Sequence, residues 1–202
     1  MSAPLPIRPP GPARPVGPAG AGAEAEAHAP VRITVMQGRA QASADPAVEM
    51  GTVLGSCVAT CLYDPRARIG GMNHFLLAEP PERAERSAFD RDYGLYLMEL
   101  LVNEMLQLGA SKGRMKGRLY GGANINPDLA PIGSANAAFA REFLRREGID
   151  QVYEDLEGRH ARRIQFRPVS GLVRCRLVAR DAAPTQKPLA RPQSAFGTVE
   201  LF

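Results

Sequence analysis

The chain has 202 residues, of which 45% are hydrophobic and only 6% aromatic, and it carries a net charge of +4 at pH 7. This length and composition support one globular domain with a sizeable core rather than two. Because basic residues are mixed with acidic ones along the chain and tryptophan is absent, the sequence argues against a nucleic-acid-binding protein. Its mildly basic character would favour an acidic partner surface, weakly and in a salt-dependent way.

The sequence also disfavours membrane insertion and secretion. No apolar run approaches the roughly 18 residues that would span a bilayer. The first residues lack the cationic and apolar blocks of a signal peptide. The three cysteines are an odd number and lack the spacing of a secreted disulfide framework. We therefore expect a cytoplasmic protein.

Both ends of the chain differ in composition from the middle. Residues 1–30 contain eight of the eighteen prolines. Such a segment buries too little apolar area to offset the entropy of ordering, so we expect a disordered arm. Residues 182–202 are similar but end in the apolar tip "GTVELF", which predicts a flexible tail that docks on the body or on a partner. Residues 31–181 are then the folded domain.

The first predicted elements are strands. "VRITVMQG" (31–38) alternates apolar and polar residues and closes on glycine, as a half-buried strand does. "SCVATCLYD" (56–64) and "MNHFLL" (72–77) are short apolar runs typical of buried strands. The intervening "DPRARIGG" predicts a turn, so the two runs form a hairpin. This hairpin would place Cys57 and His74 on neighbouring segments.

Two helices follow. The first is expected from residue 92 to the stop at Gly109. Its predicted apolar stripe consists of Leu95, Met98, Leu101, Val102, Met105 and Leu108. "GRLYGGA" then predicts a strand that runs into a glycine-rich turn. "SANAAFAREFLRREG" predicts the second helix, with Ser134 as N-cap and Gly148 as the stop.

Three further strands are predicted at residues 149–156, 162–169 and 172–180. Turns are expected between them at Glu157-Gly158 and at Ser170-Gly171. Strands outnumber helices, and neighbours in sequence favour antiparallel pairing. The expected fold is a single layered α+β domain with helices packed on a largely antiparallel sheet.

Cys57 and His74 are the candidate chemical groups. Gly55 before Ser56 permits a tight turn, which can present the Cys57 thiol beside backbone N–H groups that would bind an oxyanion. A thiol is only slightly ionised at neutral pH without a nearby base or cation. His74 follows "GGMN", whose glycines permit close approach, and is the available base.

Other readings of these residues remain open. Cysteine in an apolar strand is often simple packing, and Cys61, on the same strand face, is expected to lie in the core. A zinc site of Cys57, Cys61 and His74 lacks a fourth ligand at suitable spacing. Ser56 lacks the G-x-S-x-G pattern of a serine nucleophile. We expect no metal and no cofactor, and the residues alone indicate a Cys/His hydrolase or transferase.

The ordered set "TVLGSCVATCLYDP", "GGMNHFLL", "YGLYLMELLVNEMLQLGA", "LYGGAN" and "IGSANAAF" resembles the CheD family over residues 31–180. The resemblance implies a cytoplasmic protein-glutamine glutaminase that converts glutamines of chemoreceptor helices to glutamates. It also implies a layered α/β/β fold, similar to the catalytic domain of the cytotoxic necrotizing factor toxins.

Carried over by matching motif, the nucleophile is Cys57, the base is His74 and the third catalytic residue is Thr52. In some family members the threonine lies one residue further from the cysteine. The backbone around Gly55 and Ser56 is expected to hold the oxyanion. One departure is "DLEG", where Glu157 replaces a glycine of the family pattern and is expected to stiffen or reshape that loop.

Alternative functions are compatible with the same residues. A transglutaminase would pass the thioester to an amine, and a cysteine protease would attack a backbone amide. A different class of function is a regulatory binding module for a receptor or for a CheC-type phosphatase, a partner that the resemblance also implies.

Overall fold

The computed structural model describes residues 29–76, 84–126 and 131–178. The predicted tail of residues 182–202, and all but the last two residues of the predicted arm, lie outside the described residues. The elements are β1 (Val31–Thr34), β2 (Arg39–Ser43), β3 (Val48–Leu54), β4 (Val58–Asp64), β5 (Ile69–His74), α1 (Ala84–Gln107), the short 3-10 helix η1 (Lys112–Arg114), β6 (Lys116–Gly121), α2 (Ile132–Arg146), β7 (Asp150–Leu156), β8 (Ala161–Arg167) and β9 (Leu172–Val178).

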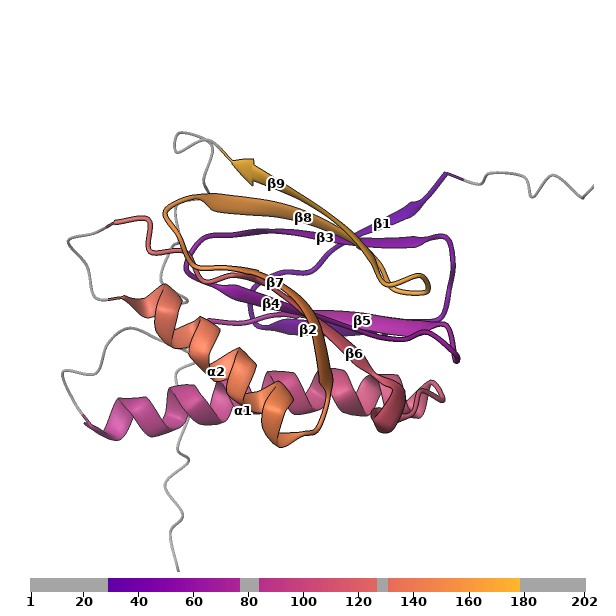
Figure 1. Ribbon diagram of the computed structural model, residues 1–202, viewed down its shortest axis with the longest axis horizontal. Helices are drawn as coiled ribbons and strands as arrows, with labels where there is room; N and C mark the ends of the chain where they lie inside the picture. Colours follow the sequence, from indigo (N-terminus) through magenta and orange to yellow (C-terminus); the bar gives the residue numbers. More distant parts are fainter. Residues whose placement is uncertain (1–28, 77–83, 127–130, 179–202) are drawn as a thin grey trace, which may run out of the picture.

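The strands form two stacked sheets (Figure 1). The five-stranded sheet, here called the central sheet, has the order β2-β5-β4-β6-β7. The four-stranded sheet, here called the outer sheet, has the order β1-β3-β8-β9. Pairing is antiparallel except between β1 and β3 and between β6 and β7. The predicted α+β class with largely antiparallel pairing is therefore confirmed.

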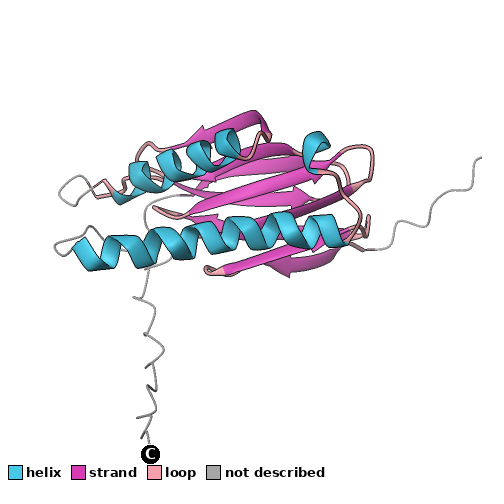
Figure 2. Ribbon diagram, turned by 90° about the horizontal axis from the view of Figure 1, so that it is seen from below, coloured by secondary structure: helices cyan, strands magenta, loops and turns pink. Residues whose placement is uncertain are grey.

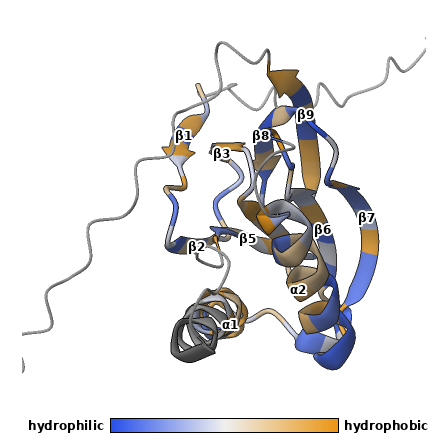
Figure 3. Cartoon of the chain, turned by 90° about the vertical axis from the view of Figure 1, so that its left-hand side faces the viewer, coloured by the Kyte–Doolittle hydropathy of each residue, from blue (hydrophilic) through white to orange (hydrophobic). Residues whose placement is uncertain are grey.

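Both helices cover the central sheet on the side away from the outer sheet, so the layers run helices, central sheet, outer sheet (Figures 2 and 3). Helix α1 packs against β2 and β5, and α2 packs against β4, β6 and β7. In the described part of the chain, no helix combines the length and apolar character needed to cross a bilayer.

Strands β4 and β5 of the central sheet are buried on both faces, because their side chains alternate between two cores. Val58, Leu62 and Phe75 face the helices, where they meet Leu101 and Met105. On the opposite face, the core between the sheets contains Cys57, Ala59, Cys61, Met72 and Tyr120 from the central sheet and Met50, Leu54, Ile164 and Phe166 from the outer sheet. Residues of β4 and the preceding loop therefore belong to one core or the other according to their parity.

The first predicted helix is confirmed, but two residues of its apolar stripe are wrong. Helix α1 begins at Ala84, earlier than expected. Leu95 is 40% exposed and Leu108 is 47% exposed. Leu97, which the pattern omitted, is 1% exposed. The buried stripe is centred near Met98 and Leu101, so Leu95 lies beside it, and Leu108 follows the last helical residue.

The predicted start of the second helix is also wrong. Helix α2 begins at Ile132 with Pro131 in the N-cap position, so Ser134 lies inside the first turn. The Ser134 hydroxyl accepts a hydrogen bond from Asn124 Nδ2 at 2.8 Å instead of capping the helix. Gly148 follows the helix end with a φ of 65°, as expected of a glycine stop.

The remaining predicted strands are present, but β5 is shifted towards the N-terminus, because residues 69–71 of the predicted turn already belong to it. Two further strands were not predicted. The hairpin of β4 and β5 forms, and the last three predicted strands are β7, β8 and β9. Strands β2 and β3 lie within residues 39–54, for which the sequence offered no strand prediction. Strand β3 occupies an inner position of the outer sheet, between β1 and β8.

Candidate active site

The β4–β5 hairpin brings Cys57 and His74 to one face of the central sheet. The ladder pairs Cys61 with Met72 and continues to a bridge between Val58 and Phe75. In this register Cys57 and His74 occupy diagonal positions, whose Cα atoms lie about 7–8 Å apart in antiparallel pairs. Because side chains alternate along a strand, both point towards the outer sheet.

Thr52 reaches the same point from the other sheet. Strand β3 pairs with β8 so that Thr52 lies opposite Ile164, whose side chain is in the core between the sheets. The Oγ1 atom of Thr52 lies 2.9 Å from Nδ1 of His74. With its spacing of five residues from Cys57, Thr52 therefore brings its hydroxyl into contact with the His74 imidazole.

The contacts of His74 define which ring nitrogen carries the hydrogen. Nδ1 lies 3.3 Å from the backbone oxygen of Val35, an atom that can only accept. Nδ1–H therefore donates to Val35 and Thr52, which leaves the lone pair on Nε2. That atom is buried and has no hydrogen-bond partner among residues 29–76, 84–126 and 131–178.

Burial also sets the charge of His74. The side chain is 6% exposed. Desolvation lowers the pKa of the ring from 6.5 to about 4, and the hydrogen bond to Val35 opposes that shift only in part. At neutral pH His74 is therefore an uncharged base.

The thiol of Cys57 is 1% exposed and contacts Gln37. Its Sγ atom donates to Oε1 of Gln37 at 3.6 Å. The thiol therefore does not donate to His74 Nε2 in this state. Contacts between a nucleophile and its base are often loose in a free enzyme and tighten when substrate binds.

Three hydrogen bonds fix the backbone of the Gly55–Cys57 loop. The carbonyl of Gly55 accepts from the Ala123 N–H at 2.8 Å, and that of Cys57 accepts from the Gly122 N–H at 2.7 Å. The carbonyl of Ser56 accepts from Asn136 Nδ2 of α2 at 2.7 Å. In a planar trans peptide the N–H points opposite to the C=O. The Cys57 N–H therefore points away from the Asn136 side chain of α2, and the Ser56 N–H points away from Ala123.

The glycines behind this loop permit backbone-to-backbone packing. A Cβ atom on Gly121, which has a φ of 105°, would lie 2.2 Å from the Cys57 oxygen. A Cβ on Gly133, in the first turn of α2, would lie 2.3 Å from the oxygen of Gly122. Any side chain at either position would push the strand end and the helix away from the nucleophile loop.

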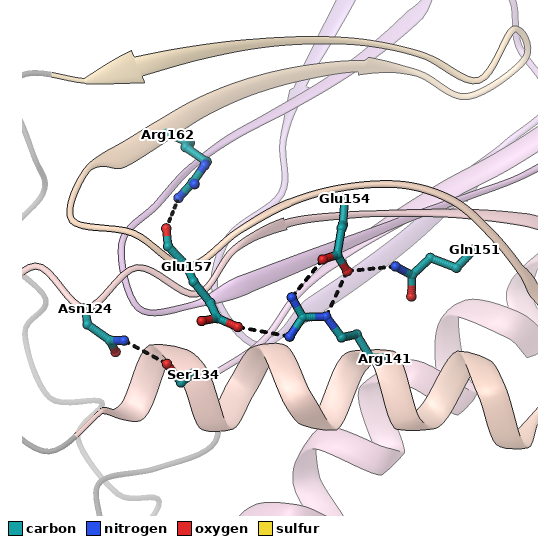
Figure 4. Close-up of polar contacts among 7 residues, drawn as sticks. All are labelled: Asn124, Ser134, Arg141, Gln151, Glu154, Glu157 and Arg162. Carbon is teal, nitrogen blue, oxygen red and sulfur yellow. Dashed lines mark hydrogen bonds and ion pairs between the residues drawn. The ribbon is translucent and has the colours of Figure 1, made fainter.

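The turn at Glu157 contacts the same strand end, and Figure 4 shows its other contacts, with Arg141 and Arg162. Glu157 has a left-handed φ of 65°, a conformation that favours glycine. Its N–H donates to the Gly121 carbonyl at 2.8 Å. Its carbonyl accepts from Arg162 at 2.8 Å, and its carboxylate accepts from Arg141 at 2.9 Å. These contacts hold Glu157 in its left-handed conformation.

The other cysteines and histidines lie outside this arrangement. Cys61 is fully buried, and burial raises the pKa of its thiol. Cys175 donates to Asp155, and burial together with this carboxylate raises its pKa to about 11. His160 is exposed, and His28 lies outside the described residues. The described segments contain no group of three or more His, Cys, Asp or Glu residues placed to bind a metal ion.

Sequence reasoning missed Val35 and Gln37, which contact the base and the thiol. Both lie in "VMQG", which was interpreted only as the end of a strand. A polar glutamine directly before a turn glycine was the available signal. It gave no indication of the partner, because the contact joins segments twenty residues apart.

Comparisons with known proteins agree on one family. A family model described as "CheD chemotactic sensory transduction" matches residues 76–177, a range that begins just after the hairpin. A protein of Caulobacter sp. (strain K31) is 47% identical over 176 residues, covering 85% of this chain and 93% of that protein. A protein of Zymomonas mobilis is 50% identical over 171 residues, covering 85% of this chain and 92% of that protein. Both are named "Probable chemoreceptor glutamine deamidase CheD".

One solved structure is similar at a much lower level. A crystal structure of a Neisseria meningitidis protein of the family model DUF152 has a TM-score of 0.38 at 14% identity, covering 59% of this chain and 53% of that one. Similarity at this level does not establish a shared fold.

Proposed function

Because the chain belongs to the CheD family, we propose that it is a chemoreceptor glutamine deamidase, which hydrolyses glutamine side chains to glutamate and ammonia. The observation that supports a Cys/His mechanism is the alignment of three side chains from two sheets. The Oγ1 atom of Thr52 contacts Nδ1 of His74. The His74 side chain, with the lone pair of its Nε2, is on the same face of the central sheet as Cys57. This is the order of groups in an acyl-transfer triad.

In the first half-reaction His74 acts as base and then as acid. Nε2 takes the Cys57 proton, and the thiolate attacks the carbon of the substrate carboxamide. The N–H groups of Ser56 and Cys57 bind the resulting oxyanion. The imidazolium returns its proton to the departing nitrogen, the C–N bond breaks, and ammonia leaves a thioester on Cys57.

In the second half-reaction water replaces the amine. Neutral His74 removes a proton from water as the water oxygen attacks the thioester carbon. The C–S bond then breaks, the imidazolium returns the proton to the sulfur, and the released side-chain acid ionises to glutamate. Thr52 and the Val35 carbonyl hold the ring with Nε2 directed at the reacting atoms in both steps. Gly55 gives the loop the tight turn that presents Cys57.

We further propose that residues 31–181 form the catalytic unit and that its fold is the layered α/β/β type of the cytotoxic necrotizing factor catalytic domains. The stacking of helices, central sheet and outer sheet supports this proposal. The site lies at one end of the interface between the two sheets, so the stacking of these layers positions the chemistry.

The proposed substrates are the cytoplasmic helices of chemoreceptors, and the proposed location is the cytoplasm. The solvent face of the outer sheet is rich in arginine, and Figure 3 shows that hydrophilic and hydrophobic residues alternate along β9. This face carries Arg32, Arg163, Arg167, Arg174 and Arg176. The one acidic residue among the described residues of this face is Glu49, which pairs with Arg32 and Arg167.

Arg163 and Arg176 lie directly opposite one another on β8 and β9, and both are exposed. Like charges opposite one another destabilise a sheet. An acidic helical surface of the receptor would relieve this repulsion, which supports docking on this face. A CheC-type phosphatase remains a second proposed partner, and the described residues single out no separate surface for it.

Reversing both charges, Arg163→Glu with Arg176→Glu, is expected to raise KM for a receptor fragment about tenfold and to leave kcat within about twofold, because rim charges act on encounter. Higher salt should shrink the difference. The matched control is Arg66→Glu, an exposed arginine in the β4–β5 turn at the far end of the hairpin. An equal KM in the double variant and the control would contradict docking on this face.

The function is tested by incubating the protein with a receptor cytoplasmic fragment, followed by peptide mapping and an ammonia assay. Deamidation adds about one dalton at each modified glutamine and releases ammonia. Joined chains would indicate amine transfer, and shortened chains would indicate proteolysis. Unchanged peptide masses and no ammonia would contradict the proposed function.

A further inference from the structure

The segment from Val35 to Gly38 touches both members of the proposed pair. The Val35 carbonyl accepts a hydrogen bond from Nδ1 of the His74 ring. The Gly38 N–H donates to the backbone carbonyl of His74 at 2.7 Å, and Gly38 has a φ of 77° in a turn closed by the bond from the Arg39 N–H to Met36. Gln37, between these anchors, is the residue whose side chain reaches Cys57.

The contact identifies the atom that Gln37 presents to the site. A thiol donates its hydrogen, so the atom that faces it is the carboxamide oxygen Oε1. Gln37 is half-buried in a surface turn, yet its side chain points inward to the nucleophile. When His74 removes the thiol proton, Oε1 loses this donor and can accept another hydrogen at the point where the thiolate attacks.

We propose that Gln37 is the residue that distinguishes the substrate's carboxamide from a carboxylate or an ester, by accepting a hydrogen bond from the substrate –NH2 group. This inference rests on the proposed deamidase function. An ester oxygen offers no hydrogen to Oε1, and the carboxylate product would place a negative oxygen against it. A site built to bind an N–H rejects analogues that lack it. The same contact would favour release of glutamate.

An alternative role for Gln37 is to bind the oxyanion, which needs a donor. The observed orientation presents an acceptor, not a donor, at the thiol, and the proposed mechanism assigns the oxyanion to the backbone N–H groups of the Gly55–Cys57 loop. The two roles predict different kinetics. Loss of an oxyanion donor slows every acyl substrate, whereas loss of an N–H acceptor slows only amides.

The test compares two receptor peptides that differ at one position, which holds either glutamine or glutamate γ-methyl ester. Gln37→Met preserves length and removes the acceptor. We expect it to lower kcat/KM for the amide peptide roughly 10- to 100-fold, the effect of one lost hydrogen bond in a buried site. The value for the ester should change less than about threefold, so the amide-to-ester ratio falls. Gln41→Met, at an exposed position of β2, is the matched control and should keep the wild-type ratio.

A second variant keeps the test independent of any loss of packing. Gln37→Glu retains acceptor oxygens, so the amide-to-ester ratio should stay within about threefold of wild type. Both rates should fall, because a carboxylate beside Cys57 opposes thiolate formation. Thermal unfolding of each variant confirms that rates are compared between folded proteins.

Two results would overturn the inference alone. One is an equal fall for both peptides in Gln37→Met, which would indicate a general contribution to catalysis. The other is an unchanged amide-to-ester ratio with unchanged rates. A wild-type protein that hydrolyses neither peptide would overturn the proposed function and this inference with it.

Discussion

Replacing Cys57 with alanine is expected to reduce ammonia release from a receptor fragment by at least about four orders of magnitude. Loss of the nucleophile leaves only binding and oxyanion stabilisation, and in a comparable acyl-transfer triad this loss costs about a millionfold. The fold should persist, because alanine leaves a void of about one sulfur atom in the core between the sheets. Peptide mapping before and after incubation measures the effect.

The matched control is Cys175→Ser, since Cys175 is a free thiol outside the site that is only partly buried, and serine preserves a donor to Asp155. This variant should deamidate at the wild-type rate. Undiminished ammonia release from Cys57→Ala would refute the assignment of Cys57 as nucleophile and would make the neighbouring Ser56 the next candidate.

Replacing His74 with glutamine is expected to lower kcat by at least roughly a hundredfold, the usual contribution of a positioned base. Glutamine has similar bulk and retains polar atoms near Thr52 and Val35, so the core should stay closed. His160→Gln, at an exposed position, serves as the control and should be fully active. A His74→Gln protein with wild-type turnover would exclude the ring as base.

The pH profile provides a second test of His74. Burial lowers the pKa of the ring to about 4, and the reaction needs the unprotonated ring. Activity should therefore hold as pH falls from about 7 to about 5 and decline about tenfold per unit below the ring pKa. Circular dichroism at each pH confirms that the protein remains folded. An acid limb of kcat/KM near 6.5, the ordinary value for histidine, would show that the ring is solvated or paired with a thiolate.

Local patterns predicted much of the fold. The β4–β5 hairpin, β6 and the last three strands are bounded by glycine, proline and aspartate, whose turn preferences act over a few residues. Strand β3 was missed because its alternation fails at Thr52, which is polar but faces the core between the sheets, and at Val53, which is apolar but lies on the other face.

The same limit applies to the candidate site: contacts within a short hairpin could be predicted from the sequence, and contacts between distant segments could not. Cys57 and His74 could be paired from sequence because one short hairpin joins them. The contact between Thr52 and His74 joins two sheets, and that between Gln37 and Cys57 joins a turn to a distant strand. Periodicity carries no information about such contacts. The early start of α2 has a similar cause, because Gly133 packs against the Gly122 backbone.

The union of Thr52 from one sheet with His74 from the other couples turnover to the alignment of the two layers. A small slide or separation of the sheets would turn the imidazole away from the sulfur while every strand remained intact. Heat or a truncated side chain such as Met50→Ala at this interface would then silence the enzyme before it melted. Loss of activity would thus reveal a change in the spacing of the two sheets before any spectroscopic measure of secondary structure changed.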